Sequence, residues 1–131
     1  MLDCLIVGDS IAVGTHQYRP ECRVHAKVGI NSSQWNRQNS SRDLTAKTLI
    51  ISLGSNDHAG VRTLWELQQL RARADAERVF WILPAIKPDV QDMVQIIARD
   101  HGDVILTIPN LQADKVHPSR VGYKKLAEQT R

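Results

Sequence analysis

Short apolar runs alternate along the chain with segments in which apolar residues recur every three or four positions. Runs rich in Val, Ile and Leu, each bounded by Gly, Pro, Asp or Asn, predict strands over residues 4–7, 23–28, 49–53, 79–83 and 104–108. Two of the intervening segments have the apolar spacing of a helix face: Val61, Leu64, Leu67 and Leu70 in one, and Val90, Met93, Val94 and Ile97 in the other.

Shorter helices are predicted after Ser10 and over residues 32–38, and a closing helix over residues 119–131. Strands that are nearly continuous apolar runs and alternate with helices indicate a parallel sheet covered on both faces. No linker, repeat or low-complexity tract interrupts this pattern. We therefore predict one α/β domain over residues 1–131, a three-layer α/β/α sandwich around a five-stranded parallel sheet.

The composition is that of an ordinary globular protein. Of 131 residues, 42% are hydrophobic and 24% are charged, which excludes an intrinsically disordered chain. The 17 basic residues exceed the 14 acidic ones only slightly, and both halves of the chain share the excess, which argues against a basic stripe for nucleic acid. No apolar run approaches the ~20 residues that a membrane helix needs. We therefore expect no nucleic-acid partner and no membrane insertion.

The two cysteines, Cys4 and Cys22, are too few for a disulfide scaffold and lack Cys-x-x-Cys spacing. The amino-terminal run has no basic segment of the kind found in export signals, so we expect a cytoplasmic protein with both cysteines reduced. A bridge between neighbouring strands is the alternative. The histidines show no metal-ligand spacing, so neither a metal nor another cofactor is expected.

Reactive groups of a parallel α/β sheet collect in the loops beyond the carboxyl ends of its strands. Ser10 follows the first strand and precedes a helical segment, so its hydroxyl and N–H lie at a helix N-terminus, where negative charge is favoured. A serine needs a neutral imidazole nearby to act as a nucleophile. In the last loop, Asp114 can hold the Nδ1–H of His117 and leave Nε2 facing the serine. These residues predict a nucleophile, a base and an orienting carboxylate.

Donors for an oxyanion follow the second and third strands. Asn56 is a short carboxamide just past the third strand. Gly29, past the second strand, offers an N–H with no side chain to block close approach. Together with the N–H of Ser10, these groups make up a three-donor oxyanion site.

Other residues near these loops are expected to have structural roles. Asp9 and Asp57 are interpreted as hydrogen-bond acceptors that hold their loops. Trp35 is either a packing anchor, which we favour, or a stacking surface for a sugar, whereas Trp65 and Trp81 are expected to be buried or half-buried packing residues.

Four sequence blocks resemble, in this order, those of the SGNH (GDSL-like) hydrolases: Gly8-Asp9-Ser10-Ile11, Gly29, Gly54-Ser55-Asn56-Asp57 and Asp114-x-x-His117-Pro118. The resemblance spans residues 8–118 and implies a flavodoxin-like sandwich with strand order 2-1-3-4-5. It implies Ser10 as nucleophile, His117 as base and Asp114 as its orienter. It also implies an oxyanion hole made by Ser10, Gly29 and Asn56, and no cofactor.

We therefore expect a serine ester hydrolase that acts through an acyl-enzyme. Five strands and five helices in 131 residues leave little chain for a lid or a long acyl groove, so an open site is expected. Such a site favours short acyl groups, above all O-acetyl groups of carbohydrate or cell-wall polymers. A lysophospholipase or thioesterase is the alternative, followed by a noncatalytic flavodoxin-like binding domain. A receiver-type or nucleotide-binding domain is disfavoured, because the chain lacks the acidic cluster and the phosphate loop that these need.

Overall fold

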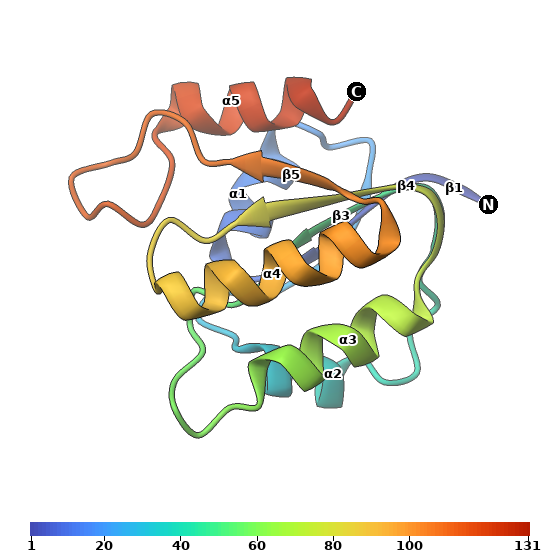
Figure 1. Cartoon of the computed structure of the whole chain (residues 1–131). Helices are drawn as coiled ribbons and strands as arrows, with labels where there is room; N and C mark the ends of the chain where they lie inside the picture. The colour runs from blue at the N-terminus through green and yellow to red at the C-terminus, as the bar shows by residue number, and fades with distance from the viewer.

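The computed structural model describes all 131 residues, and strands alternate with helices along the whole chain (Figure 1). The strands are β1 (Leu2–Gly8), β2 (Arg23–Ala26), β3 (Thr45–Ser52), β4 (Asp75–Leu83) and β5 (Val104–Thr107). The helices are α1 (Ser10–Gln17), α2 (Ser32–Gln38), α3 (Thr63–Arg73), α4 (Pro88–His101) and α5 (Arg120–Gln129). The longest helix has 14 residues, and none has both the length and the apolar composition needed to cross a membrane.

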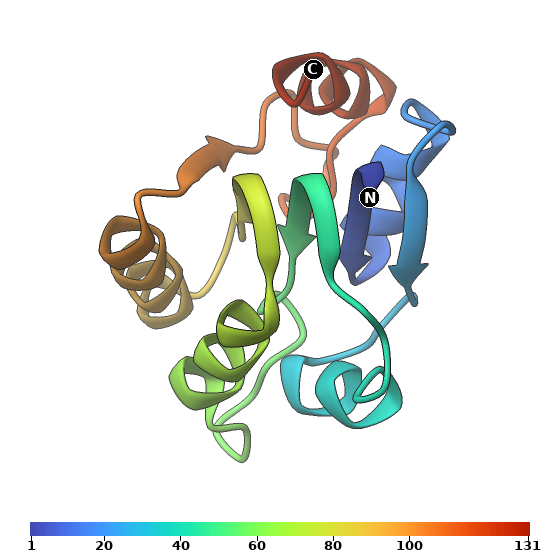
Figure 2. The same ribbon diagram turned by 90° about the vertical axis from the view of Figure 1, so that its right-hand side faces the viewer.

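The five strands form one parallel sheet in the order β2-β1-β3-β4-β5. Helices α1 and α5 cover one face of this sheet and α2, α3 and α4 cover the other (Figure 2). The predicted three-layer sandwich and its strand order are therefore confirmed. The chain leaves β1 toward β2 and then crosses back to β3, so the strand order reverses between β1 and β3. Ligand crevices of α/β sheets form at this kind of switch point.

The central strands supply two apolar cores, because successive residues of a strand face opposite sides of the sheet. Leu5 and Val7 of β1 belong to a cluster of 17 buried residues beneath α2, α3 and α4. Cys4 and Ile6 belong to a cluster of 11 beneath α1 and α5. A slip of one residue would exchange the two sets, so burial on both faces fixes the register of β1.

Several strand boundaries differ from the sequence prediction. β3 and β4 each begin four residues earlier than predicted, and Thr45 pairs with Asp75 in this extension. The apolar pattern marks only the buried part of a strand, whereas backbone pairing continues into the exposed part. β2 ends two residues earlier than predicted, because residues 27–30 form a turn in which the Ile30 N–H donates to the Lys27 carbonyl at 3.3 Å. Gly29 has a φ of +80° in this turn, a conformation that favours glycine.

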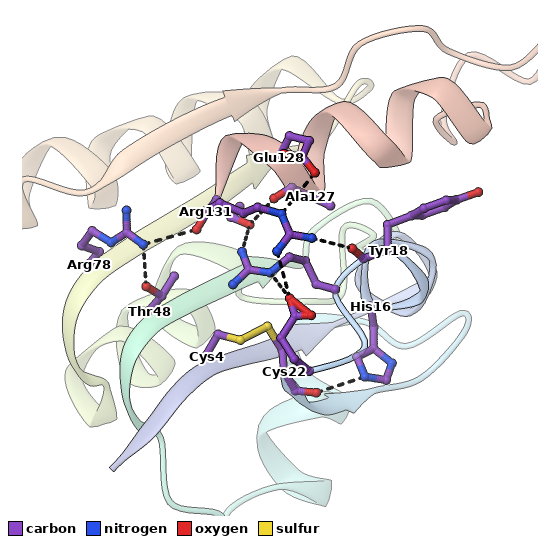
Figure 3. A network of polar contacts seen from close by, with 12 residues as sticks. Cys4, His16, Tyr18, Cys22, Thr48, Arg78, Ala127, Glu128 and Arg131 are labelled. Carbon is purple, nitrogen blue, oxygen red and sulfur yellow. Dashed lines mark hydrogen bonds and ion pairs between the residues drawn. A yellow bond between two sulfur atoms is a disulfide. The ribbon is translucent and has the colours of Figure 1, made fainter.

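The expectation that both cysteines are reduced is wrong: Cys4 and Cys22 form a disulfide (Figure 3). Leu5 of β1 pairs with Arg23 of β2, so the two cysteines, one residue earlier on each side, lie beside each other. Their Cα atoms are 4.8 Å apart, within the range that a disulfide spans. The sequence prediction assumed a reducing cytoplasm, in which disulfides are rare. The bridge instead follows from the strand order, which places β2 next to β1.

Polar contacts around the disulfide tie the end of α5 to the segment before β2 (Figure 3). Arg19 is 7% exposed, and its guanidinium donates to the hydroxyl of Thr130 and to the Glu21 carboxylate. Glu21 also accepts from Arg131 at 3.3 Å. These contacts and the disulfide lie at the opposite ends of β1 and α1 from Ser10, so they are structural features remote from the predicted site.

Candidate active site

Ser10 is placed by a tight turn between β1 and α1. Asp9 caps the helix, and its Oδ1 accepts the N–H of Ile11 at 3.1 Å. Gly8 has a φ of +139°, and a Cβ there would overlap the carbonyl oxygen of Ser52 on β3. Only glycine therefore lets β1 turn this close to its neighbour. As the first residue of α1, Ser10 has an N–H without a partner inside the helix.

The structure brings the side chains of Ser10, His117 and Asp114 into one hydrogen-bonded chain. Ser10 Oγ lies 2.8 Å from His117 Nε2, and His117 Nδ1 lies 2.8 Å from Asp114 Oδ2. The side chains of His117 and Asp114 are 36% and 46% exposed. The group thus lies at the surface of the protein.

Asp114 is held as an anion by its own loop. Its Oδ1 accepts the backbone N–H groups of His117 at 3.0 Å and Val116 at 2.9 Å. These two hydrogen bonds, followed by the one to the His117 ring, lower the pKa of Asp114 to about 2. The carboxylate therefore stays charged across the pH range in which an imidazole titrates.

The loop after β5 folds back on itself to present these two residues. The Gln112 N–H donates to the His117 carbonyl at 2.8 Å, and the Ser119 N–H donates to the Asn110 carbonyl at 2.7 Å. Lys115 at the tip has a φ of +60°, the left-handed value of a tight turn. The hairpin-like shape explains how Asp114 and His117, three residues apart, direct both side chains to one place.

The candidate oxyanion donors lie in three neighbouring loops. Because β2, β1 and β3 are adjacent, the loops that carry Gly29, Ser10 and Asn56 emerge side by side. The Lys27 N–H donates to the Gly8 carbonyl at 3.0 Å, which keeps the turn containing Gly29 beside the end of β1. The Gly29 N–H makes no hydrogen bond within the protein. The Asn56 carboxamide uses its Nδ2 to donate to the Ile30 carbonyl at 3.0 Å, which leaves its second N–H available.

Asp57 organises the loop after β3. It is 2% exposed, and its carboxylate accepts from the Ser32 N–H at 2.9 Å and from the Ser32 and Thr63 hydroxyls at 2.6 and 2.8 Å. One carboxylate thus holds the first residues of α2 and α3 against the loop that carries Asn56. The prediction that Asp57 holds its loop is confirmed.

Asp9 is likewise a hydrogen-bond acceptor that holds its loop, as predicted, and it is also buried. It is inaccessible to solvent and accepts the Ser52 hydroxyl at 3.0 Å. Burial raises its pKa to about 6, although this hydrogen bond and those from the backbone act in the opposite direction. Its second oxygen, Oδ2, has no partner.

Lys87 also holds the loop after β3 that carries Asn56, although no pattern in the sequence distinguishes this lysine. Its ammonium group donates to the carbonyl oxygens of Ser55, at 2.8 Å, and Asp57. These two carbonyls flank Asn56, so Lys87 fixes the backbone on both sides of the carboxamide. Its own φ and ψ of 65° and 81° are left-handed, a strained geometry for a lysine. Only the tertiary fold brings Lys87 to this loop, so no sequence signal could have identified it.

The tryptophans divide differently from the sequence prediction. Trp35 is fully buried and donates to the His25 carbonyl at 2.9 Å, so it is the packing anchor that was favoured. Trp81 is also fully buried. Trp65 is 45% exposed and lies on the surface of α3, so the expectation of a packing residue is wrong for it. No group of three or more His, Cys, Asp or Glu side chains is arranged to hold a metal ion.

Comparison with known proteins supports the fold. No family model matches the sequence, and no curated protein matches it. A structure from Bacteroides fragilis described as an acylhydrolase superposes with a TM-score of 0.67 at 17% identity, covering 96% of this chain and 83% of that one. The catalytic domain of peptidoglycan O-acetyltransferase A from Streptococcus pneumoniae gives 0.64 at 17%, covering 97% and 89%. A GDSL-like lipase from Bacteroides uniformis gives 0.62 at 14%, covering 98% and 93%.

These similarities extend over nearly the whole chain. The chain therefore shares its fold with these three proteins, one of which is described as GDSL-like, in agreement with the fold that the sequence blocks imply. A fold hosts many functions, so the activity of this chain has to be argued from its own site.

Proposed function

We propose that this protein is a serine ester hydrolase that works through an acyl-enzyme. The observation that carries the proposal is the continuous hydrogen-bonded chain from Ser10 Oγ through the His117 ring to Asp114, with 2.8 Å at both steps. A serine oxygen at this distance from a ring nitrogen, whose other nitrogen faces a carboxylate, has the arrangement needed for nucleophilic attack.

His117 acts as the base in its neutral form. Nδ1–H donates to Asp114, so Nε2 carries the lone pair that accepts the Ser10 proton. As Ser10 Oγ bonds to the ester carbonyl carbon, His117 takes this proton and the carbonyl oxygen becomes an oxyanion. The bond to the alcohol then breaks, and His117 returns the proton to the leaving oxygen.

Water completes the cycle. His117 removes a proton from water as its oxygen attacks the acyl carbon, and the ester bond to Ser10 breaks with return of the proton to Ser10 Oγ. Asp114, charged because of its lowered pKa, stabilises the imidazolium that forms in each half-reaction. The N–H groups of Ser10 and Gly29 and the free N–H of Asn56 are assigned to the oxyanion. No step requires a cofactor.

The proposed substrates are short-chain acyl esters, above all O-acetyl groups on carbohydrate or cell-wall polymers. The exposure of His117 and Asp114 supports an alcohol of large size. Neither Ser10 nor His117 lines any of the five best-defined cavities, which have volumes of about 340–590 Å³, and this supports a short acyl group. A lysophospholipase or thioesterase is the second candidate.

The disulfide bears on where the protein works. Disulfides persist in oxidising compartments and are rare in the reducing cytoplasm. The Cys4–Cys22 bridge therefore favours a site of action outside the cytoplasm, in place of the cytoplasmic location expected from the sequence. A cell-wall polymer would be accessible there.

A series of p-nitrophenyl esters from acetate to octanoate, measured beside acetylated oligosaccharides and lysophosphatidylcholine, tests the proposal. We expect kcat/KM to be highest for acetate and to fall with acyl length, because none of the five best-defined cavities is lined by Ser10 and could receive a longer chain. A maximum at octanoate, or faster release from lysophosphatidylcholine than from acetylated sugars, would favour the second candidate. Absence of hydrolysis with every ester would reject the enzyme and leave a binding domain.

A further inference from the structure

A groove lies between α2 and α3, which run side by side on one face of the sheet (Figure 2). It has a volume of about 490 Å³, within the range of small-molecule sites. Its lining is polar apart from one aromatic residue: Ser33, Asn36, Arg37, Ser40, Trp65, Glu66, Gln69 and Arg73.

The groove begins next to the loop that carries Asn56. Asp57 in that loop binds Ser32 at the start of α2 and Thr63 at the start of α3. Ser33 and Trp65, one and two residues further along their helices, already line the groove. A chain-like molecule with its reactive group near Ser10 could therefore continue across this loop into the groove.

Trp65 is the distinctive residue of the groove. It is 45% exposed, whereas the other two tryptophans are fully buried. The guanidinium of Arg62 lies 5.0 Å from the ring centroid and covers one face. Arg62 does not line the groove, so the groove meets another part of the ring. An exposed indole beside hydroxyl and amide groups combines an apolar stacking face with hydrogen-bonding partners.

The charged groups of the groove already have partners within the protein. Arg73 donates to the carbonyl oxygens of Asn39 and Arg42 at 2.9 and 2.7 Å. The Glu66 carboxylate accepts from Asn36 at 2.9 Å. Arg37, the third charged residue of the lining, donates to the Ser33 hydroxyl at 3.3 Å. The groove thus holds two guanidinium groups and one carboxylate, so it presents charges of both signs, each with a hydrogen-bond partner. Trp65 is its single apolar side chain, but carbon atoms of the polar side chains also form much of its surface, so the groove suits a ligand that has both apolar faces and polar groups.

We propose that this groove is a saccharide subsite, in which the apolar face of a sugar ring stacks on Trp65 and its hydroxyls bind Ser33 and Gln69. This inference rests on the proposed function and deepens it, because it assigns the alcohol part of the ester to a neutral carbohydrate chain. The chain runs from the groove across the Asn56 loop and presents its O-acetyl group to Ser10.

Binding can be tested without catalysis in the Ser10→Ala variant. The probes are β-1,4-linked hexamers of N-acetylglucosamine and of xylose. We expect at least one hexamer to change tryptophan fluorescence and to protect Trp65 from oxidation by N-bromosuccinimide, because the other tryptophans are buried. Adding Trp65→Ala should weaken binding about tenfold or more. Ile96→Ala, which removes a 41% exposed side chain on α4, is the matched control and should leave binding unchanged.

Kinetics provide the second readout, with Ser10 intact. Trp65→Ala should raise KM for the acetylated hexamer that binds by about tenfold and leave kcat and p-nitrophenyl acetate hydrolysis nearly unchanged. Gln69→Ala should show a smaller effect of the same kind, which guards against misfolding of a single variant.

Failure of both hexamers to bind at millimolar concentration, or equal binding with and without Trp65, would overturn the subsite. Binding to phosphatidylcholine vesicles in place of the hexamers would also overturn it. Hexamer binding that depends on Trp65 in a protein with no esterase activity would uphold the subsite and reject the proposed function, so the two can fail separately.

Discussion

The Asn56 carboxamide donates a 3.0 Å hydrogen bond to the carbonyl oxygen of Ile30, which lies 26 residues earlier in the chain. Ile30 directly follows Gly29, so this contact joins the loop after β3 to the loop after β2. It fixes the rotation of the carboxamide and couples the positions of two proposed oxyanion donors. The second N–H of Asn56 is then preorganised, as electrostatic stabilisation of a transition state requires.

Asn56→Ala should lower kcat by about 10²–10³-fold with little change in KM, because the lost donor binds charge present only in the transition state. A residue that only holds the turn would behave differently: its removal would lower Tm and leave the kcat of the folded fraction intact. Measuring Tm and active-site-titrated kcat on one preparation separates these outcomes. Wild-type kcat with lowered Tm would remove Asn56 from the oxyanion site.

Lys87→Met should lower kcat by roughly tenfold, because the carbonyls on both sides of Asn56 lose their donor and the carboxamide is less well positioned. Lys87→Arg should restore part of the rate. Lys47→Met is the matched control, since Lys47 pairs with Asp3 at 3.6 Å and both side chains are largely exposed. Equal kcat values for the two methionine variants would show that Lys87 does not position the loop.

Asp9→Asn should stabilise the protein at neutral pH. Burial raises the pKa of folded Asp9 from 3.8 to about 6, so folding disfavours the charged carboxylate. Its contribution to the free energy of unfolding is fully present below pH ~4 and is lost as the pH rises to about 6. The variant should therefore gain about 1–3 kcal/mol over the wild type across this interval. Urea unfolding at several pH values measures it, and a pH-independent difference would contradict the assignment.

Reduction of the Cys4–Cys22 disulfide should lower the free energy of unfolding by about 3 kcal/mol, the chain-entropy value for a sequence separation of 18 residues. Denaturant titrations with and without a thiol-free reductant measure the change, and the Cys4→Ala/Cys22→Ala protein controls for effects of the reductant. The protein is purified from an oxidising compartment, unfolded without reductant and treated with an alkylating reagent. If both cysteines are then alkylated, the bridge does not form.

Much of the fold could be predicted from local patterns, because buried strands and helix faces carry a clear apolar signal. The range of α2 was predicted to the residue, and the order of β1 and β2 followed from the family resemblance. The exposed beginnings of β3 and β4 could not be predicted, since backbone pairing there involves polar side chains. The disulfide was missed because it depends on which strands become neighbours.

The candidate site shows the same division between local and tertiary information. Ser10 begins α1 directly after a tight turn, and Asp114 and His117 stand in the loop after β5. Their types and their places at strand ends were sufficient to predict their proximity. Lys87 reaches its loop from a different strand end, and Trp65 becomes a surface residue only through the packing of α3 against α2. Neither position has a pattern in the sequence that distinguishes it from an ordinary lysine or a packing tryptophan.

The central claim is that Ser10 is the nucleophile, and covalent labelling tests it most directly. A serine-directed fluorophosphonate, followed by peptide mapping, should modify Ser10 alone. Ser10→Ala should abolish labelling and lower p-nitrophenyl acetate hydrolysis by about 10³-fold or more with Tm retained. Ser55→Ala removes a hydroxyl in the loop after β3 that makes no hydrogen bond. This variant should leave both the labelling of Ser10 and the rate of p-nitrophenyl acetate hydrolysis unchanged. Labelling of a different serine, or a Ser10→Ala rate within a few-fold of the wild type, would contradict the account.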